Sequence, residues 1–175
     1  MKKIFTLFMT VITMSVFMAG CGNNAGQSDS GKIAGMQLTD IVNAIYEKKT
    51  PGFSLVTDTI DISNSDTLKY KTGLSNADKI KEALVSEPMI GSQAYALVLV
   101  RLKNSSDAQA VAQEMKDNID PRRWICVEAD DVRVVAQDDV VMHVMISSAF
   151  ADELTASDLA DAFKEIAGSL SVDLK

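Results

Sequence analysis

Apolar residues recur at intervals of three and four positions in four stretches of the chain, the spacing that places side chains on one side of an α-helix. The first stretch has Leu38, Ile41, Val42 and Ile45 at these positions. It is followed by Lys48 and Lys49, which suit the carboxyl end of a helix, and by Pro51, which does not continue one. A helix is therefore predicted to begin near Leu38 and to end before Pro51.

Two further helices are predicted in the middle of the chain. One begins near Ser75 and ends before Pro88, and the other covers about 106–119 and ends before Pro121. The second of them opens on a serine three residues before a glutamine, which is the spacing of a capping box. The apolar positions are Ala77, Ile80 and Leu84 in the first helix, and Ala108, Val111, Ala112, Met115 and Ile119 in the second.

The last predicted helix has the strongest start signal in the chain. Thr155 and Asp158 have the spacing of a capping box, and Leu154 and Leu159 occupy the positions of a hydrophobic staple. Its apolar face consists of Leu159, Phe163, Ile166 and Leu170.

The segments between the helices contain runs that are typical of β-strands. Residues 94–102 are almost wholly apolar, which favours a central strand covered on both faces. Residues 132–136 and 140–146 flank the polar residues 137–139. This spacing predicts an antiparallel hairpin.

The region between residues 53 and 72 is the least regular part of the pattern. Weak strand signals lie at 53–55 and 68–70, and residues 64–66 have the composition of a turn. Together with the elements above, the order along the chain predicts an α+β fold, with one mostly antiparallel sheet and helices packed on it.

The first twenty residues have the pattern of a targeting segment rather than of a folded element. Lys2 and Lys3 precede the apolar run 4–18, which at about 15 residues is shorter than the ~20 that a membrane-spanning helix needs. The run ends at Met18-Ala19-Gly20-Cys21, which resembles the lipobox of bacterial lipoproteins. The residue three positions before the cysteine is usually leucine in that family, and methionine is similar in bulk and polarity.

The lipobox resemblance implies cleavage before Cys21 and a diacylglyceryl group on its thiol. Several acyl chains would then hold the protein on the membrane, facing the extracytoplasmic side. The alternative is an ordinary secreted protein with a chance cysteine at its cleavage site. We therefore expect a signal peptide at 1–20, a flexible tether rich in Gly, Ser and Asn at 21–35, and a single globular domain at 36–175.

Composition limits the classes of partner and the means of stabilisation. Removing residues 1–20 leaves 15 basic residues against 24 acidic ones, a net charge of −9. A chain this acidic is a poor candidate for binding nucleic acid, whose phosphates require Lys and Arg. With Cys21 lipidated, only Cys126 remains, so an intrachain disulfide is excluded and packing must supply the stability.

The middle of the chain is similar to a family of small bacterial lipoproteins described only as domain of unknown function 4358. The similarity covers about 36–148 and depends on element order and on phrases such as SEPMIGSQAYALVLVRLK and IDPRRWICVEADDVRVVAQDDVVMHVMIS. Members often carry a glycine in the turn of the last hairpin, where this chain has Asp138-Asp139. The resemblance implies one lipidated extracytoplasmic domain, and it brings no activity, cofactor or site residue.

Residues with catalytic potential are few. The chain has no Gly-rich phosphate-binding turn, and Gly91-Ser92-Gln93 does not match the G-x-S-x-G of a serine hydrolase. Cys126 and His143 are the one combination of a nucleophile and a base. Because both lie in apolar stretches, the favoured interpretation is a small buried thiol and a histidine at the sheet face.

Two other groups of residues are candidates for binding. Acidic residues near the hairpin offer oxygen ligands for calcium, although charged turns of an acidic protein explain them more simply. These residues are Glu128, Asp130, Asp131, Asp138 and Asp139. The second group is Arg122, Arg123 and Trp124, which combines two cations with the single tryptophan of the chain. The favoured interpretation of this group is a tryptophan that closes the end of the core, with the two arginines paired to nearby acidic residues and able to stay in water.

These observations give three hypotheses on function. The first is a non-enzymatic, lipid-anchored module without a cofactor that binds a protein or ligand of the cell envelope. The second is an envelope enzyme that uses Cys126 or an acidic cluster. The third is a structural accessory of a membrane complex. The candidate site residues are Cys21 for lipidation and Arg122, Arg123 and Trp124 for contact, with no metal ligands expected.

Overall fold

A six-stranded sheet runs through the middle of the molecule, and every neighbouring pair of its strands is antiparallel. The computed structural model describes residues 32–175. The strands follow one another across the sheet in the order β1-β2-β3-β5-β4-β6. Their bounds are β1 Leu55–Thr59, β2 Ile80–Pro88, β3 Tyr95–Leu102, β4 Asp131–Gln137, β5 Val140–Ile146 and β6 Val172–Leu174. The predicted α+β class and the antiparallel sheet are confirmed.

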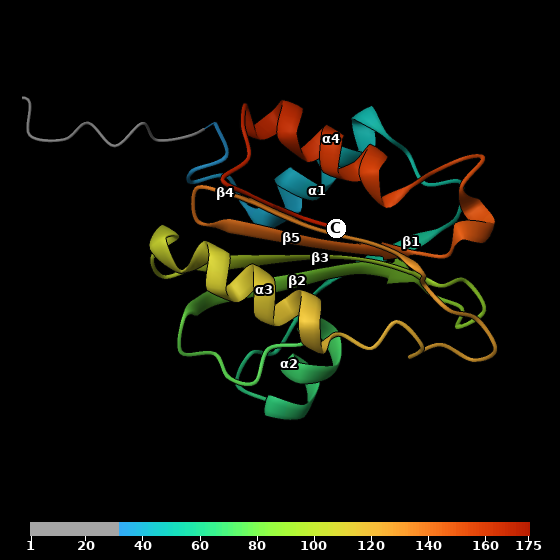
Figure 1. The fold of residues 1–175 in the computed structure, drawn as a ribbon, viewed down its shortest axis with the longest axis horizontal. Coiled ribbons are helices and arrows are strands. Elements are labelled where there is room, and N and C mark those ends of the chain that lie inside the picture. Colours follow the sequence, from blue (N-terminus) through green and yellow to red (C-terminus); the bar gives the residue numbers. More distant parts are fainter. Residues whose placement is uncertain (1–31) are drawn as a thin grey trace, which may run out of the picture.

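Four α-helices cover the two faces of this sheet (Figure 1). Helices α1 and α4 lie on one face, and α2 and α3 lie on the other. The bounds of the helices are α1 Leu38–Lys48, α2 Ser65–Thr72, α3 Ala108–Asn118 and α4 Ala156–Ala167, with single 3₁₀ turns η1 Ser105–Asp107 and η2 Ser148–Phe150. The predicted helices near 38 and after 155, and the predicted helix before Pro121, are therefore confirmed.

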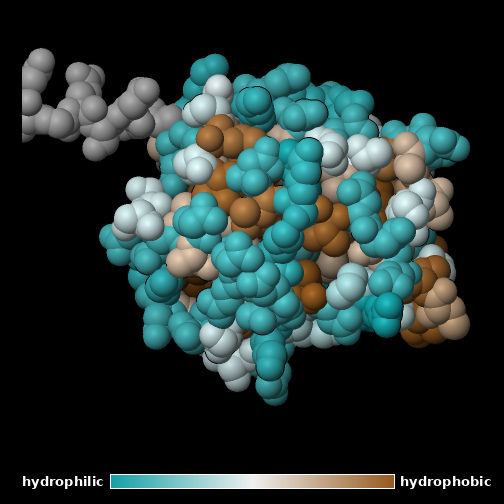
Figure 2. Space-filling view, viewed as in Figure 1, coloured by the Kyte–Doolittle hydropathy of each residue, from teal (hydrophilic) through white to brown (hydrophobic). Residues whose placement is uncertain are grey.

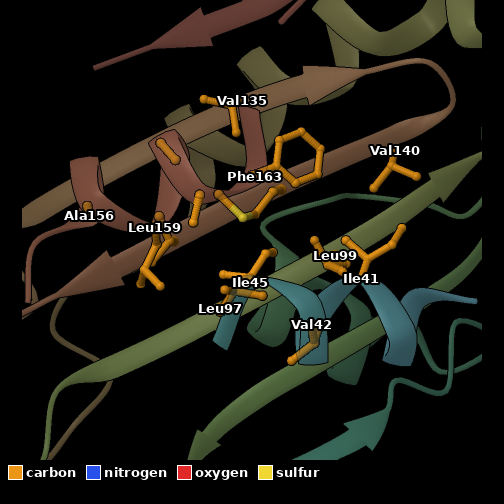
Figure 3. Close-up of a cluster of buried hydrophobic side chains, with 14 of the residues drawn as sticks. Ile41, Val42, Ile45, Leu97, Leu99, Val135, Val140, Ala156, Leu159 and Phe163 are labelled. Carbon is orange, nitrogen blue, oxygen red and sulfur yellow. The ribbon is translucent and has the colours of Figure 1, made fainter. Parts of the chain in front are cut away.

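Strand β3 is the predicted central strand, and all eight of its residues are buried. It pairs with β2 on one side and β5 on the other, so alternate side chains enter two different core layers. Leu97 and Leu99 point to the layer under α1 and α4, where Ile41, Ile45 and Phe163 surround them (Figure 3). Val98 and Val100 point to the opposite layer, under α3. Coverage on both faces explains why the strand has no polar alternation.

The hairpin of β4 and β5 also forms as predicted, with Gln137 paired to Val140 across a two-residue loop. The first loop residue, Asp138, has a φ of 53°. This left-handed conformation is one that aspartate adopts more readily than most non-glycine residues, so Asp138 can take the place of the glycine or asparagine that is common in short hairpin loops.

Of the two capping boxes predicted from the sequence, one forms and the other does not. Thr155 and Asp158 form both hydrogen bonds of the capping box at the start of α4. The capping box predicted at Ser106 does not form, because 3₁₀ turn η1 includes that residue and Asp107 takes the N-cap position of α3.

Two predictions in the first half of the domain are wrong. The segment expected as a helix after Ser75 contains β2, which pairs with both β1 and β3. Residues 68–70, expected as a strand, lie inside α2. The expected turn at 64–66 is the start of that helix, with the Asn64 side chain accepting a hydrogen bond from the Thr67 backbone N–H. Of the strand signal at 53–55, only Leu55 lies in β1.

The amino-terminal end of the described chain is fastened to the sheet. The Ile33 side chain is fully buried in the layer with α1, so packing begins three residues before the predicted boundary at Met36. The buried Arg101 of β3 donates a hydrogen bond to the Met36 carbonyl and ion pairs to Glu82 and Asp139. The expected signal peptide, Cys21 and the tether up to residue 31 lie outside the described residues.

Gly73 marks a close approach of α2 to the carboxyl end of α3. It has a φ of 79°, and a Cβ atom there would lie 3.0 Å from the Ile119 nitrogen and 3.0 Å from the Met115 oxygen. Gly168, which ends α4, has a similar φ of 89°, but its Cβ would meet only the flexible Lys32 side chain at 3.5 Å. The two glycines therefore share backbone conformation and differ in the space around them.

Gly73→Ala is expected to lower the free energy of unfolding by about 3 kcal/mol, because it adds a backbone clash to the left-handed strain of about 1–2 kcal/mol. Gly168→Ala, the matched control, carries the strain alone and should cost about 1 kcal/mol. Urea unfolding of both variants measures the difference. Equal losses in the two variants would contradict the close packing of α2 on α3.

Candidate functional site

Two long loops meet at one end of the sheet. The loop between β2 and β3 comprises residues 89–94, and the loop between α3 and β4 comprises residues 119–130. Because Tyr95 and Asp131 both pair with Ile146, the two loops lie at the same end, on the right in Figure 1. The second loop carries the predicted contact residues Arg122, Arg123 and Trp124.

Arg123 is held inside this end of the molecule, and its side chain is only 2% exposed. Its guanidinium donates hydrogen bonds to the Tyr70 carbonyl at 2.9 Å and to the Lys71 carbonyl at 3.4 Å, and it pairs with Glu87 of β2 at 3.3 Å. Arg123 therefore pairs with an acidic residue as predicted, but the prediction that both arginines stay in water is wrong for it. The buried cation ties the end of α2 to the end of β2.

The same guanidinium lies between two aromatic rings. Its Cζ atom is 5.3 Å from the centre of the Tyr70 ring and 4.9 Å from the centre of the Trp124 ring. Contacts of this length are attractive, because the negative face of each ring meets the cation. Burial lowers the pKa of Arg123, while Glu87 opposes that shift, and the group stays charged at neutral pH.

Trp124 and Arg122 lie in the same loop but differ in the exposure of their side chains. Trp124 is half-buried and packs on a small apolar cluster that includes Ala96 and Met145, in agreement with a tryptophan at the end of the core. Arg122 extends into water with 76% of its side chain exposed, and its one ion pair within the described part of the chain is with the partly exposed Glu128 at 3.2 Å. Of the three predicted contact residues, Arg122 alone presents its charge to solvent.

Large apolar side chains are exposed at the same end of the molecule. Met89 is 79% exposed, Ile90 58% and Ile125 77%, and Tyr70 of α2 is half-exposed beside them in the Arg123 stack. Figure 2 shows apolar atoms projecting at the right-hand edge, where these loops lie. Sequence reasoning did not find these residues, although the charge-free segments PMIGSQ and WICV were a visible signal.

Cys126 is exposed, so the expected buried thiol is wrong. It has a φ of 62°, and the alternation around it turns Trp124 and Val127 toward the core and Ile125 and Cys126 outward. The apolar stretch therefore has an inner and an outer side although it is a loop.

His143 is fully buried on the α3 side of β5, between Val98 of β3 and Val134 of β4. Neither ring nitrogen has a hydrogen-bond partner in the described part of the chain. Burial, with a smaller contribution from the positive charge of Arg123, lowers the pKa of His143 to about 3, so the ring is neutral at physiological pH. Because no hydrogen bond links it to the exposed Cys126, the two residues do not form a nucleophile and base.

The acidic residues considered for calcium binding are separated by the length of β4. Asp130 accepts hydrogen bonds from the backbone and hydroxyl of Ser148, and Asp131 accepts one from the Ala156 N–H at the start of α4. Asp138 and Asp139 lie in the turn at the other end of the strand. Within residues 32–175, no three His, Cys, Asp or Glu residues are grouped as metal ligands would be.

Over the described range, no helix is both long and apolar enough to cross a bilayer. The chain was also compared with family models, with curated proteins and with solved structures, and none of them matches it.

Proposed function

We propose that the protein is a lipid-anchored lipoprotein of the extracytoplasmic face of the cell membrane, and that its domain is a non-enzymatic binding or accessory module. The observation that carries the proposal is the sequence Met18-Ala19-Gly20-Cys21 directly after a positively charged start and a short apolar run. A thiol at that point is suited to acylation, and two or more acyl chains hold a protein stably on a bilayer.

The arrangement of the domain supports a binding role over the enzymatic alternative. Among residues 32–175, Cys126 is exposed on a loop while His143 is buried without a hydrogen-bond partner, so His143 does not act as a base for the candidate nucleophile Cys126. Asp130 and Asp131, two of the acidic residues considered for a site, accept hydrogen bonds from backbone N–H groups and a hydroxyl that shape the domain. What the domain does offer to its surroundings is an end with exposed apolar side chains.

Mass spectrometry of the membrane fraction tests the anchor. The expected result is an amino-terminal peptide that begins at Cys21 and carries the mass of a diacylglyceryl group. Cys21→Ser is expected to accumulate as an unprocessed precursor without lipid, while Cys126→Ser, the control for thiol loss, is processed normally. Recovery of the wild type as a soluble form with an unmodified Cys21 would overturn the proposal.

A further inference from the structure

Apart from Tyr70 of α2, the large exposed apolar side chains of residues 32–175 lie at the tips of two loops. Met89 and Ile90 follow β2, and Ile125 lies midway between α3 and β4. Both loops extend past the last paired residues of the sheet, so these side chains project from the end of the molecule rather than line a hollow. Exposed apolar groups that are gathered in this way mark an interaction surface.

The two loop tips contain no charged residue, although charged residues are frequent in the rest of the protein. Neither segment 88–93 nor segment 124–127 contains a charged residue, whereas the chain has 24 acidic and 17 basic residues. A tip without carboxylates or amines enters an apolar phase without desolvating an ion, which is the main cost of such a transfer. The chemistry of the tips therefore fits hydrocarbon.

Behind the tips lies a layer of aromatic and cationic groups. Tyr70 and Trp124 flank the guanidinium of Arg123, and both rings are only partly covered by the protein. Tyrosine and tryptophan are enriched where a membrane meets water, because their apolar rings and polar edges suit that boundary. Arg122, with its exposed side chain, is placed to reach lipid phosphates.

We infer that the tips of the two loops, with the exposed side chains of Met89, Ile90 and Ile125, insert into the lipid surface of the membrane on which the chain is anchored. The inference rests on the proposed lipid anchor, which supplies the membrane and keeps it close, so that weak insertion suffices. The tether attaches at the opposite end, where Arg101 holds Met36. Eleven chain steps lead from Cys21 to Lys32. At full extension these residues reach about 36 Å. This exceeds the length of about 26 Å for the eight residues of β3, which run from the end with the two loops to the tether end of the sheet.

The test uses the one thiol that lipidation leaves free. The mature lipidated protein is labelled on Cys126 with the polarity-sensitive dye NBD and reconstituted in phosphatidylcholine vesicles. A blue-shifted emission that is quenched by spin-labelled lipid and protected from iodide is expected. The matched control is a Ser105→Cys label in a Cys126→Ser background, because Ser105 is exposed at the tether end of the sheet. This label is expected to stay in water.

A double variant shows whether the two loops act together. Met89→Ser with Ile90→Ser leaves the labelled loop untouched and removes two exposed side chains. Burying an isoleucine is worth about tenfold or more in a partition constant. The variant should therefore reduce the equilibrium constant between the inserted and water-exposed states of the Cys126 label by at least about tenfold.

Three outcomes overturn the inference. They are a water-like Cys126 label, a membrane-inserted Ser105→Cys label, and a Cys126 shift that occurs in native membranes but not in lipid vesicles, which would mean that a protein covers the tips. Failure of the anchor is a separate result, seen as an unlipidated Cys21 and loss of the protein from the vesicles. The two proposals thus fail in distinguishable ways.

Discussion

Replacing Arg123 with alanine is expected to lower the free energy of unfolding by about 3 kcal/mol, because it removes the buried cation of a partly buried ion pair. The substitution leaves Glu87 with Lys71 as its remaining cation, and it leaves the carbonyls of Tyr70 and Lys71 without the guanidinium donor. It also removes the group between the Tyr70 and Trp124 rings. Urea unfolding at neutral pH measures the loss.

Arg122→Ala is the matched control, since it deletes the same kind of side chain one residue away. Arg122 is largely exposed and its pair with Glu128 is solvated, so the expected loss is within about 0.5 kcal/mol. If the two alanine variants unfold at the same urea concentration, Arg123 does not have the structural role described here, and both arginines return as candidates for contact with a partner.

His143 is expected to make the domain sensitive to mild acid. Its pKa is about 3 in the folded protein and near 6.5 in the unfolded chain, so the unfolded state binds the additional proton over this range. The contribution of the neutral His143 ring to the free energy of unfolding should therefore be fully present above pH 6.5. It should fall as the pH decreases below that value. The expected loss is about 3 kcal/mol between pH 6.5 and about pH 4.5.

His143→Leu is expected to remove most of this pH dependence. Leucine has a similar size, does not titrate and leaves no unpaired nitrogen in the core. Carboxylates with lowered pKa values, such as Asp158 and Asp173, also lose stabilising contacts in acid, but from an ordinary value of 3.8 and therefore below this window. A wild type and a variant with the same slope of stability against pH would refute the assignment.

Long elements with both a core pattern and an end signal were predictable from the sequence. Helix α4 has a capping box and a complete apolar stripe, and β3 has eight apolar residues in a row, so local and tertiary preferences agree. Helix α2 has only Leu68 and Thr72 buried, which is too few to define a period. Asn64 and Gly73, its two caps, were the only signals, and both also suit a turn.

Strand β2 was misread because a strand buried on both faces has no alternation. Ala77, Ile80 and Leu84 match helical spacing by coincidence, while Ala83 and Val85 between them are buried as well. The strand is recognisable only through its partners β1 and β3, which are distant in sequence. Pairing of this kind is a tertiary property that a local pattern does not contain.

The candidate site was predictable in place but not in detail. The segment of Arg122, Arg123 and Trp124 was singled out by its composition, and it does lie at the end of the core. Which arginine is buried depends on Tyr70, Lys71 and Glu87, which come from α2 and β2 and are more than thirty residues away. The exposure of Cys126 likewise follows from the course of a loop and not from the apolarity of its neighbours.

The position of β6 affects the order in which the domain can be completed. This strand follows every other element in the chain, yet it covers the edge of β4, and its Asp173 makes a two-bond pair with the nearly buried Arg133. A chain that emerges from a ribosome or a membrane pore amino terminus first therefore keeps β4 as an open edge until residue 174 has appeared. The charge of Arg133 lacks its carboxylate partner for the same period. Closure of this edge of the sheet thus awaits the synthesis of β6, and in that interval β4 is open to pairing with other chains.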